Sequence, residues 1–269
     1  MPIYQQGEIM PELPDVEHFR DYLQKTSLNQ KISSVQVKDN RILKDVDQSS
    51  LRRLLVDNRF TETFRYGKNI FLRIDKAPWL TLHFGMTGDL KYYSEPSDKP
   101  PFERLSIVFS NGSTLGYSDQ RLFGRIGVTS SPEDFISEHH LGKDALEIDK
   151  DGFLKVLSGK RRSIKNLLMD QRLIAGIGNE YSDEILFQAG ILPQRGSDSL
   201  KREDFLKIFN SMKMVLKTAL KAHGDKKRFP ESFLLRNRRK GAKCPGCNTA
   251  MESFRLGGRT GYFCPGCQV

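Results

Sequence analysis

The sequence predicts an α+β multidomain protein: an N-terminal antiparallel β-sandwich with flanking helices, then a helical domain that ends in a zinc-finger β-hairpin. Three observations support this. Short runs that alternate apolar and polar residues dominate the first half of the 269-residue chain. From about residue 151, apolar residues recur at helical spacing. All four cysteines fall within the last 26 residues.

The N-terminal half begins with a helix. Three apolar residues lie at helical spacing: Val16, Phe19 and Leu23. Asp15, directly after Pro14, is the expected N-cap. A region of short extended runs follows, and it includes residues 35–37, 70–74, 80–84 and 105–109. A short helix near 50–56 interrupts this region, and 96–101 is expected to be a loop.

The C-terminal half is predicted to be helical. One helix ends near Leu168, and residues 175–178 form a glycine-rich turn. Asn179 is expected to cap the next helix, which runs to Gly190, and a further amphipathic stretch covers 202–221. A basic connection over residues 226–240 then leads to the cysteines.

The composition is that of a globular chain, with 38% hydrophobic and 28% charged residues. No run approaches the roughly 18 apolar residues of a membrane span, and the first residues lack the basic and apolar regions of a secretory signal. We therefore expect a cytoplasmic protein without a membrane partner.

Positive charge is concentrated in the second half. The net charge is +10, divided into −2 for residues 1–150 and +12 for residues 151–269. This asymmetry favours a polyanion-binding module, with nucleic acid as the first candidate and an anionic membrane surface as the second. A purely solubilising surface is the alternative.

The four cysteines form two C-P-G-C knuckles, and they are Cys244, Cys247, Cys264 and Cys267. A separation of 16 residues between the knuckles fits a site with one tetrahedral Zn²⁺. Disulfides are the alternative, and a cytoplasmic location disfavours them. Four cysteine ligands leave no open coordination position, so the zinc is expected to be structural.

Two further segments suggest chemistry. Gly176-Ile177-Gly178-Asn179 precedes a helix and could bind a phosphate through backbone N–H groups, although capping alone also explains it. Pro11, followed by Glu12, would be a secondary amine if the chain began there. With a pKa near that of an α-amino group, about 7.7–8.0, it could form an iminium with a sugar aldehyde carbon, while Glu12 exchanges protons. A proline-rich lead into a helix is the alternative.

Six segments in chain order together resemble one family. They are Met10–Glu17 (MPELPDVE), Gly67-Lys68, His83–Gly88 (HFGMTG), Asp119–Gly124 (DQRLFG), Asp170–Asn179 (DQRLIAGIGN) and Gly257–Gln268. The set is similar to the bacterial formamidopyrimidine-DNA glycosylase (Fpg/Nei) family. No single segment is specific, but the ordered set is.

The resemblance implies a base-excision-repair DNA glycosylase with AP-lyase activity on oxidised purines and formamidopyrimidines. Position by position, Pro11 is the Schiff-base nucleophile at C1′ of the damaged nucleotide. Glu12 handles protons at the sugar, and Lys68 lies near the active-site phosphate. The strand is then cut by elimination.

DNA contacts are implied in the same way. Met86, Arg121 and Phe123 enter the duplex where the damaged base has been flipped out. They refill the gap and so offset the few kcal/mol of unstacking that base flipping costs. Three residues are expected to hold phosphates: Lys165, Asn179 and Arg259. The expected partner is double-stranded DNA with oxidised bases or abasic sites, bound by a nucleoid-associated monomer.

The resemblance also implies four segments: an extension (1–9), a catalytic β-sandwich domain (10–140), a helix–two-turn–helix DNA-binding domain (150–225) and a zinc finger (235–269). An amide-bonded proline cannot attack C1′, so the functional chain is expected to begin at Pro11.

The chain also departs from the family pattern. Asp15 stands where the family has Glu, and Gln120 where it often has Pro. The connection over 221–239 is shorter than usual and lacks the loop that closes over a flipped purine. We therefore expect stronger activity on formamidopyrimidines or abasic sites than on 8-oxoguanine.

Two other functions remain open at this stage. One is a non-catalytic relative that binds kinked or damaged DNA. The other is a zinc-ribbon RNA-binding or ribosome-associated protein, which leaves Pro11 and Glu12 without a role. Borohydride trapping on DNA separates both from a Schiff-base enzyme.

Overall fold

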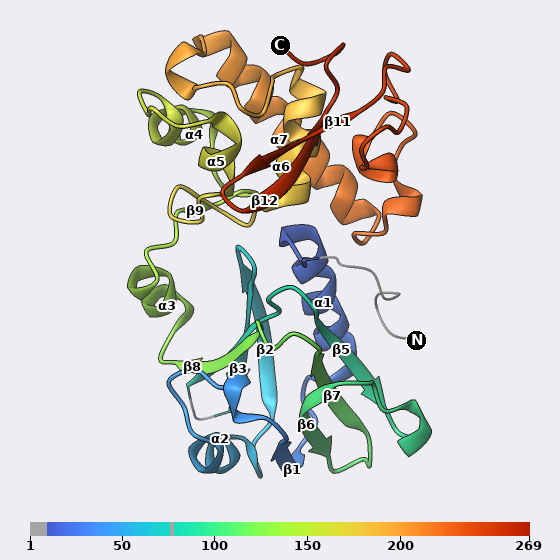
Figure 1. The fold of residues 1–269 in the computed structure, drawn as a ribbon. Coiled ribbons are helices and arrows are strands. Elements are labelled where there is room, and N and C mark those ends of the chain that lie inside the picture. Colours follow the sequence, from blue (N-terminus) through green and yellow to red (C-terminus); the bar gives the residue numbers. More distant parts are fainter. Residues whose placement is uncertain (1–9, 76–77) are drawn as a thin grey trace. The chain divides into compact units, whose positions relative to one another are not determined.

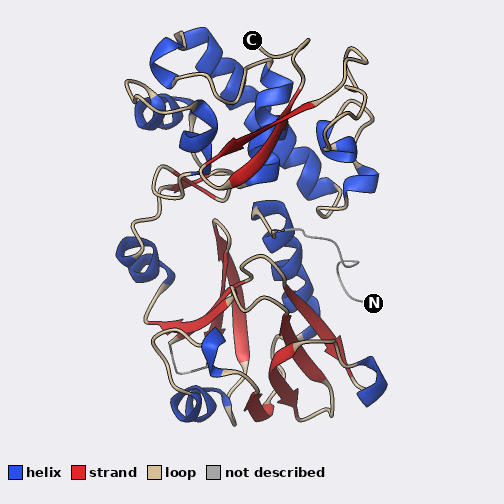
Figure 2. Cartoon of the chain, viewed as in Figure 1, coloured by secondary structure: helices blue, strands red, loops and turns tan. Residues whose placement is uncertain are grey.

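The computed structural model describes residues 10–75 and 78–269 (Figures 1 and 2). The expected extension at residues 1–9 lies outside this description. The chain forms two compact units, each with its own apolar core. Among the described residues, unit 1 contains residues 10–11 and 15–139, and unit 2 contains residues 12–14 and 140–269.

Unit 1 contains two four-stranded antiparallel sheets, ordered β1-β6-β7-β5 and β2-β3-β4-β8. The strands are β1 (Ile32–Val37), β2 (Phe60–Tyr66), β3 (Asn69–Ile74), β4 (Trp79–His83), β5 (Gly88–Tyr93), β6 (Glu103–Phe109), β7 (Thr114–Asp119) and β8 (Arg125–Thr129). Side chains from both sheets, including Leu72, Leu80 and Ile107, share one buried cluster. The predicted antiparallel β-sandwich is confirmed.

The described residues of this half of the chain form three α-helices: α1 (Leu13–Thr26), α2 (Gln48–Leu55) and α3 (Pro132–Glu138). The expectation that Asp15 caps the first helix was wrong, because α1 begins two residues earlier. Pro14 lies in its first turn, where a missing N–H costs nothing. The predicted loop at 96–101 contains one 3-10 turn, Pro96–Asp98.

Unit 2 is mainly helical. Its helices are α4 (Lys150–Leu157), α5 (Ile164–Met169), α6 (Asn179–Ala189) and α7 (Arg202–Lys221), and β9 (Lys143–Asp144) pairs in parallel with β10 (Ile174–Ala175). Two 3-10 turns, Lys226–Arg228 and Leu234–Asn237, lead to the hairpin of β11 (Glu252–Leu256) and β12 (Arg259–Phe263). The predicted helical domain and terminal hairpin are confirmed. Within the described ranges, no helix is long and apolar enough to cross a bilayer.

Helix α6 is central to unit 2. It packs against α5, α7 and β12, and Figure 1 shows β12 lying along it. Gly190 ends the helix in the left-handed conformation, with φ of 70°. Its N-cap is Gly178 and not the predicted Asn179, whose side chain turns away to another partner.

Candidate functional site

The first turn of α6 holds the carboxylate of Glu12. One oxygen accepts from the amide of Glu180 at 2.8 Å, and the other accepts from the amides of Gly178 and Tyr181 at 2.6 and 3.3 Å. Glu12 is 1% exposed. A carboxylate at this position satisfies orphan amides and interacts favourably with the positive end of the helix dipole.

The contact with Glu12 corrects the prediction that the glycine-rich turn binds a phosphate. The amides of Gly178, Glu180 and Tyr181 are used by an anion of the chain itself. Gly176 has φ of 113°, and a Cβ there would lie 2.5 Å from the side chain of Leu13. The amide of Leu13 also donates to the carbonyl of Gly176 at 3.1 Å. The turn is therefore fitted to the residues that follow Pro11, which is itself buried.

In unit 1, Lys68 lies in the tight turn between β2 and β3. Arg65 orders this turn, since its guanidinium donates to Glu17 at 2.6 Å and to the carbonyl of Gly67 at 3.1 Å. Gly67 has φ of 57°, which favours glycine. Lys68 is half-buried at the end of this braced hairpin.

His83, at the end of β4, was not singled out from the sequence. Its Nδ1 accepts from the amide of Gly85 at 3.1 Å, which leaves Nε2 as the donor. Burial, with the positive charges of Lys68 and Arg125, lowers the pKa of His83 to about 4. The imidazole is therefore neutral at pH 7. Its position at the start of the His83–Gly88 motif was the available signal.

Asp119 organises the loop that carries Arg121 and Phe123. This buried carboxylate accepts from the hydroxyl of Thr87 at 2.5 Å and from the amides of Arg121 and Gly124 at 3.2 and 2.7 Å. Arg121 lies over the ring of Phe123 at 5.1 Å. Phe123 is 51% exposed, so core packing does not explain it.

Met86 precedes Thr87 in the turn between β4 and β5 and is half-buried. The hydrogen bond from Thr87 to Asp119 therefore connects the Met86 turn to the Arg121–Phe123 loop. The structure brings these three predicted residues to one end of the sheet.

Lys165 is fully buried in unit 2, which does not favour its predicted contact with a phosphate. Its ammonium donates to the carbonyl of Asn179 at 2.8 Å, to Ser182 Oγ at 2.9 Å and to Asp183 Oδ1 at 2.5 Å. Burial lowers the pKa of Lys165, and the charge of Asp183 opposes that change. Lys165 therefore positions α6 against α5.

The hairpin of β11 and β12 is fixed to α6 by the same group of residues. Asp183 Oδ2 accepts from the guanidinium of Arg238 at 2.7 and 2.9 Å and from the amide of Tyr262 at 3.0 Å. The side-chain amide of Asn179 donates to the carbonyl of Thr260 at 2.9 Å. Arg259, next to Thr260, is exposed. Asn179 and Arg259 are thus held on neighbouring, rigidly connected elements.

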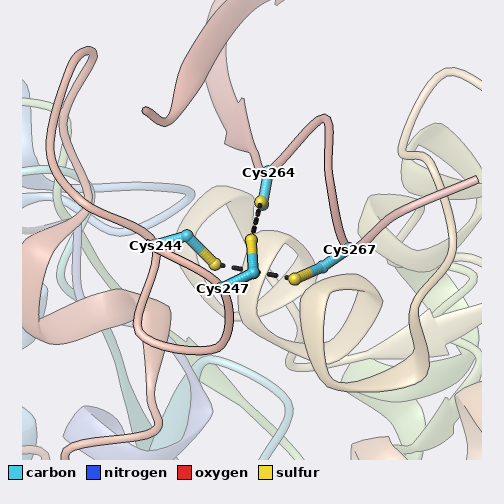
Figure 3. Close-up of side chains that lie close together, drawn as sticks. All are labelled: Cys244, Cys247, Cys264 and Cys267. Atoms are coloured by element: carbon cyan, nitrogen blue, oxygen red, sulfur yellow. Dashed lines mark hydrogen bonds between the residues drawn. The ribbon is translucent and has the colours of Figure 1, made fainter. Parts of the chain in front are cut away.

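The four cysteines converge at the base of this hairpin (Figure 3). All four Sγ atoms lie within 4.8 Å of one another, with Cys244–Cys267 at 3.7 Å and Cys247–Cys264 at 3.4 Å. All four are free thiols and not disulfides. Sulfur atoms bound to one tetrahedral Zn²⁺ at about 2.3 Å lie ~3.8 Å apart, so the cluster fits a metal of this kind.

Comparison with known proteins gives the family. Residues 10–126 match the formamidopyrimidine-DNA glycosylase N-terminal domain, and residues 141–231 match the formamidopyrimidine-DNA glycosylase H2TH domain. The formamidopyrimidine-DNA glycosylases of Moorella thermoacetica and Mycoplasma mobile are 34% and 30% identical to the chain. Each match covers 96% of this chain, and 92% and 99% of the relative, respectively.

Solved structures agree. The Lactococcus lactis formamidopyrimidine-DNA glycosylase, bound non-covalently to DNA with an AP site, matches with a TM-score of 0.87 and 26% identity. The match covers 96% of this chain and 99% of that one. The same enzyme with Fapy-dG DNA matches with a TM-score of 0.86. The chain therefore belongs to the formamidopyrimidine-DNA glycosylase family.

Proposed function

We propose that this protein is a base-excision-repair DNA glycosylase with AP-lyase activity on oxidised purines and formamidopyrimidines in duplex DNA. The observation that carries the proposal is the placement of Glu12. Its carboxylate is buried and held by three backbone donors, directly after Pro11, where the family match begins. A proline-rich lead into a helix does not require a buried carboxylate at this position.

Pro11 acts as the nucleophile once it is the chain terminus. Its nitrogen bonds to C1′ of the damaged nucleotide while the bond from C1′ to the base breaks. That electron pair leaves with the base, which takes up a proton. The Pro11 nitrogen then loses its proton and the bond from C1′ to O4′ breaks, so that O4′ takes up a proton as a hydroxyl and an iminium forms between Pro11 and C1′. Loss of a proton from C2′ and of the phosphate from C3′ then cuts the strand.

Glu12 is the group that exchanges protons at the sugar, because it is adjacent to Pro11 and its orientation is fixed. Lys68 supplies a positive charge for a phosphate of the damaged nucleotide. His83, with a neutral ring that donates from Nε2, is a second donor for a phosphate oxygen.

DNA binding uses residues that are exposed or half-buried. Met86, Arg121 and Phe123 fill the gap left by the flipped base. Arg259 and the second hydrogen of the Asn179 amide bind backbone phosphates. Lys165 supports this surface from within the protein and contacts no phosphate. Because the substrate is genomic DNA, we place the protein at the nucleoid, in the cytoplasm.

Cys244, Cys247, Cys264 and Cys267 would hold one Zn²⁺. When bound, the ion fixes the hairpin that carries Arg259, and four thiolates leave it no open position for catalysis. The chemistry of the donor set supports zinc, since thiolates select soft and borderline metals.

The lesion preference follows from the connection between α7 and the hairpin. The side chains of Phe229, Phe233 and Leu235 anchor this otherwise largely exposed segment to the core of unit 2. Lys226 is paired with Glu180 at 2.5 Å. A connection that is short and anchored in this way offers no loop to close over a flipped purine, which supports faster excision of formamidopyrimidines, and faster cleavage at abasic sites, than excision of 8-oxoguanine. Equal or faster excision of 8-oxoguanine in single-turnover assays would show that another segment reads the base.

Borohydride trapping tests the enzyme assignment. A chain that begins at Met10, with that Met removed, should form a borohydride-stable adduct with abasic-site DNA. A chain that retains residues 1–9 should not, because its Pro11 nitrogen is an amide. Pro11→Gly should keep some trapping through its primary amine.

Two outcomes contradict this proposal in different ways. Equal trapping by the uncleaved 269-residue chain would make a lysine, first of all Lys68, the nucleophile. Tight binding to abasic-site DNA without any trapping would favour the non-catalytic DNA-binding relative.

A further inference from the structure

We propose that Phe102 and Arg104 form a second DNA contact beside Arg121 and Phe123, so that two arginine–phenylalanine pairs engage the duplex. The inference rests on the proposed function for the identity of its ligand. It assigns a role to two residues that no sequence motif and none of the steps above require.

Both arginine–phenylalanine pairs are held in place by hydrogen bonds to Asp119. The carboxylate of Asp119 holds the Arg121–Phe123 loop, and its backbone holds the other pair. The amide of Asp119 donates to the carbonyl of Phe102 at 3.0 Å, and Arg104 Nε donates to the carbonyl of Asp119 at 2.8 Å.

The strand register places both pairs at the same end of one sheet. Asp119 ends β7, and its neighbour Ser118 pairs with Glu103, the first residue of β6. Gly88, the first residue of β5, pairs with Asp119. Phe102 therefore lies where the Met86 turn and the Arg121–Phe123 loop also lie.

The two phenylalanines share an unusual exposure. In the described part of the chain, Phe102 and Phe123 are the exposed residues among the phenylalanines, tyrosines and tryptophan, at 48% and 51%. Each has an arginine near its ring: Arg104 at 5.9 Å from the Phe102 centroid and Arg121 at 5.1 Å from that of Phe123. An exposed phenylalanine gains little from folding, so burial does not explain either residue.

The backbone of Phe102 strengthens this argument. Its φ is 54°, in the left-handed region that glycine and asparagine adopt readily and bulky residues rarely do. A phenylalanine that is both strained and exposed is unfavourable for the fold on two counts. Strain of this kind concentrates at functional positions.

Duplex DNA is the ligand that this chemistry fits. Aromatic faces stack on bases or sugars, and an arginine adds a charge for phosphate. Besides its bond from Nε, the guanidinium of Arg104 makes no other side-chain hydrogen bond within residues 10–75 and 78–269. Its terminal nitrogens can therefore bind a phosphate oxygen while Phe102 stacks alongside.

Phe102→Asn tests the proposal, because asparagine tolerates the backbone angle but removes the ring. In the full chain we expect affinity for duplex DNA with an abasic-site analogue to fall about 10-fold. The melting temperature should stay the same or rise, since the strain is relieved. Phe102→Tyr should keep the affinity. Met214→Gln, which replaces an exposed apolar side chain on α7 by a polar one of similar helix propensity, is the matched control and should change neither quantity.

Salt dependence separates the two residues. Phe102→Asn should leave the slope of log K against log salt unchanged, whereas Arg104→Gln should reduce it by about 0.9. Unchanged affinity in a folded Phe102→Asn protein would overturn the proposal, as would a loss of affinity that only follows a fall in melting temperature. If the Met10 chain traps no DNA but Phe102→Asn still weakens binding, the enzyme assignment fails and this contact stands.

Discussion

Glu12 connects two parts of the chain that local sequence cannot relate, since 166 residues separate it from Gly178. Three amides at the start of α6 need acceptors, and one carboxylate supplies them. The side chain that is expected to exchange protons at the sugar is therefore also the cap of the central helix. A substitution here should affect both stability and chemistry.

For Glu12→Gln, we expect glycosylase activity to be lost while DNA binding is retained. One carboxylate oxygen becomes an NH₂ group that cannot accept, so at least one buried amide loses its partner. The free energy of unfolding should fall by about 1–3 kcal/mol. Urea unfolding, gel-shift binding and base release would measure the three effects. Full base release by this variant would remove Glu12 from the mechanism.

Glu184 provides a pH-dependent prediction. It is fully buried on α6 and accepts from the amide of Leu235 and from Gln188, both at 2.8 Å. Burial raises its pKa from 4.5 to about 7. The native state therefore holds this proton more tightly than the unfolded state does. Stability should fall as pH rises from about 4.5 to about 7, and the full cost remains above pH 7.

Glu184→Gln should remove this pH dependence and stabilise the protein at pH 8 by on the order of 2–3 kcal/mol. Thermal melts between pH 5 and pH 8 provide the measurement, and the exposed Glu231→Gln is the control. If the difference in melting temperature between the wild-type and Glu184→Gln proteins is the same at every pH in this range, the carboxylate does not titrate there.

At the scale of elements, the terminal hairpin and α6 form one structural assembly. Thr260 and Tyr262 of β12 are held by Asn179 and Asp183 of α6. Arg259 lies between Gly258, at the hairpin turn, and Thr260, so its position depends on both attachments. Four cysteines lie together at the base of the hairpin, where a bound metal would hold the other end.

Removal of the metal should therefore melt the hairpin and weaken DNA binding by displacing Arg259. Cys247→Ser should behave like chelator treatment, whereas the neighbouring Thr249→Ser should bind DNA normally. Unit 1 should stay folded, because its core contains no residue of the hairpin. Elemental analysis should find one zinc per chain, and its absence from the native protein would rule out the assignment.

At the scale of the whole molecule, the excess of positive charge in the second half predicts strongly salt-dependent DNA binding. Log K should fall linearly with log salt, by about 0.9 for each phosphate contact. Arg259→Ala should reduce that slope by about one contact and weaken binding to damaged and undamaged duplex alike.

Lys217→Ala, which removes an exposed positive charge on α7, is the matched control and should leave the slope nearly unchanged. The Lys165→Met slope should also stay near the wild-type value, since the ammonium of Lys165 is used inside the protein. This variant should instead lose stability, because Asp183 loses one of its buried partners. A flat salt response of the wild-type protein would contradict the phosphate contacts as a group.

The sequence by itself determined the architecture and the family. Alternating runs predicted the antiparallel sheets, because side chains on a strand alternate between faces. Helical spacing predicted the second half, and the paired C-P-G-C knuckles predicted the cysteine cluster. These features depend on residues that are close together in the chain or arranged in a fixed order.

Only the tertiary structure decided which charged groups are available to a ligand. Lys165 is as basic in the sequence as Arg259, yet one is buried against Asp183 and the other is exposed. The glycine-rich turn received the carboxylate of Glu12 instead of an external phosphate, and Phe102 emerged as an exposed, strained aromatic residue. The physical reason is common to all three. A charged or aromatic side chain acts differently according to its burial and its partners. Those partners lie on segments far apart in the chain, and no sequence periodicity predicts such pairings.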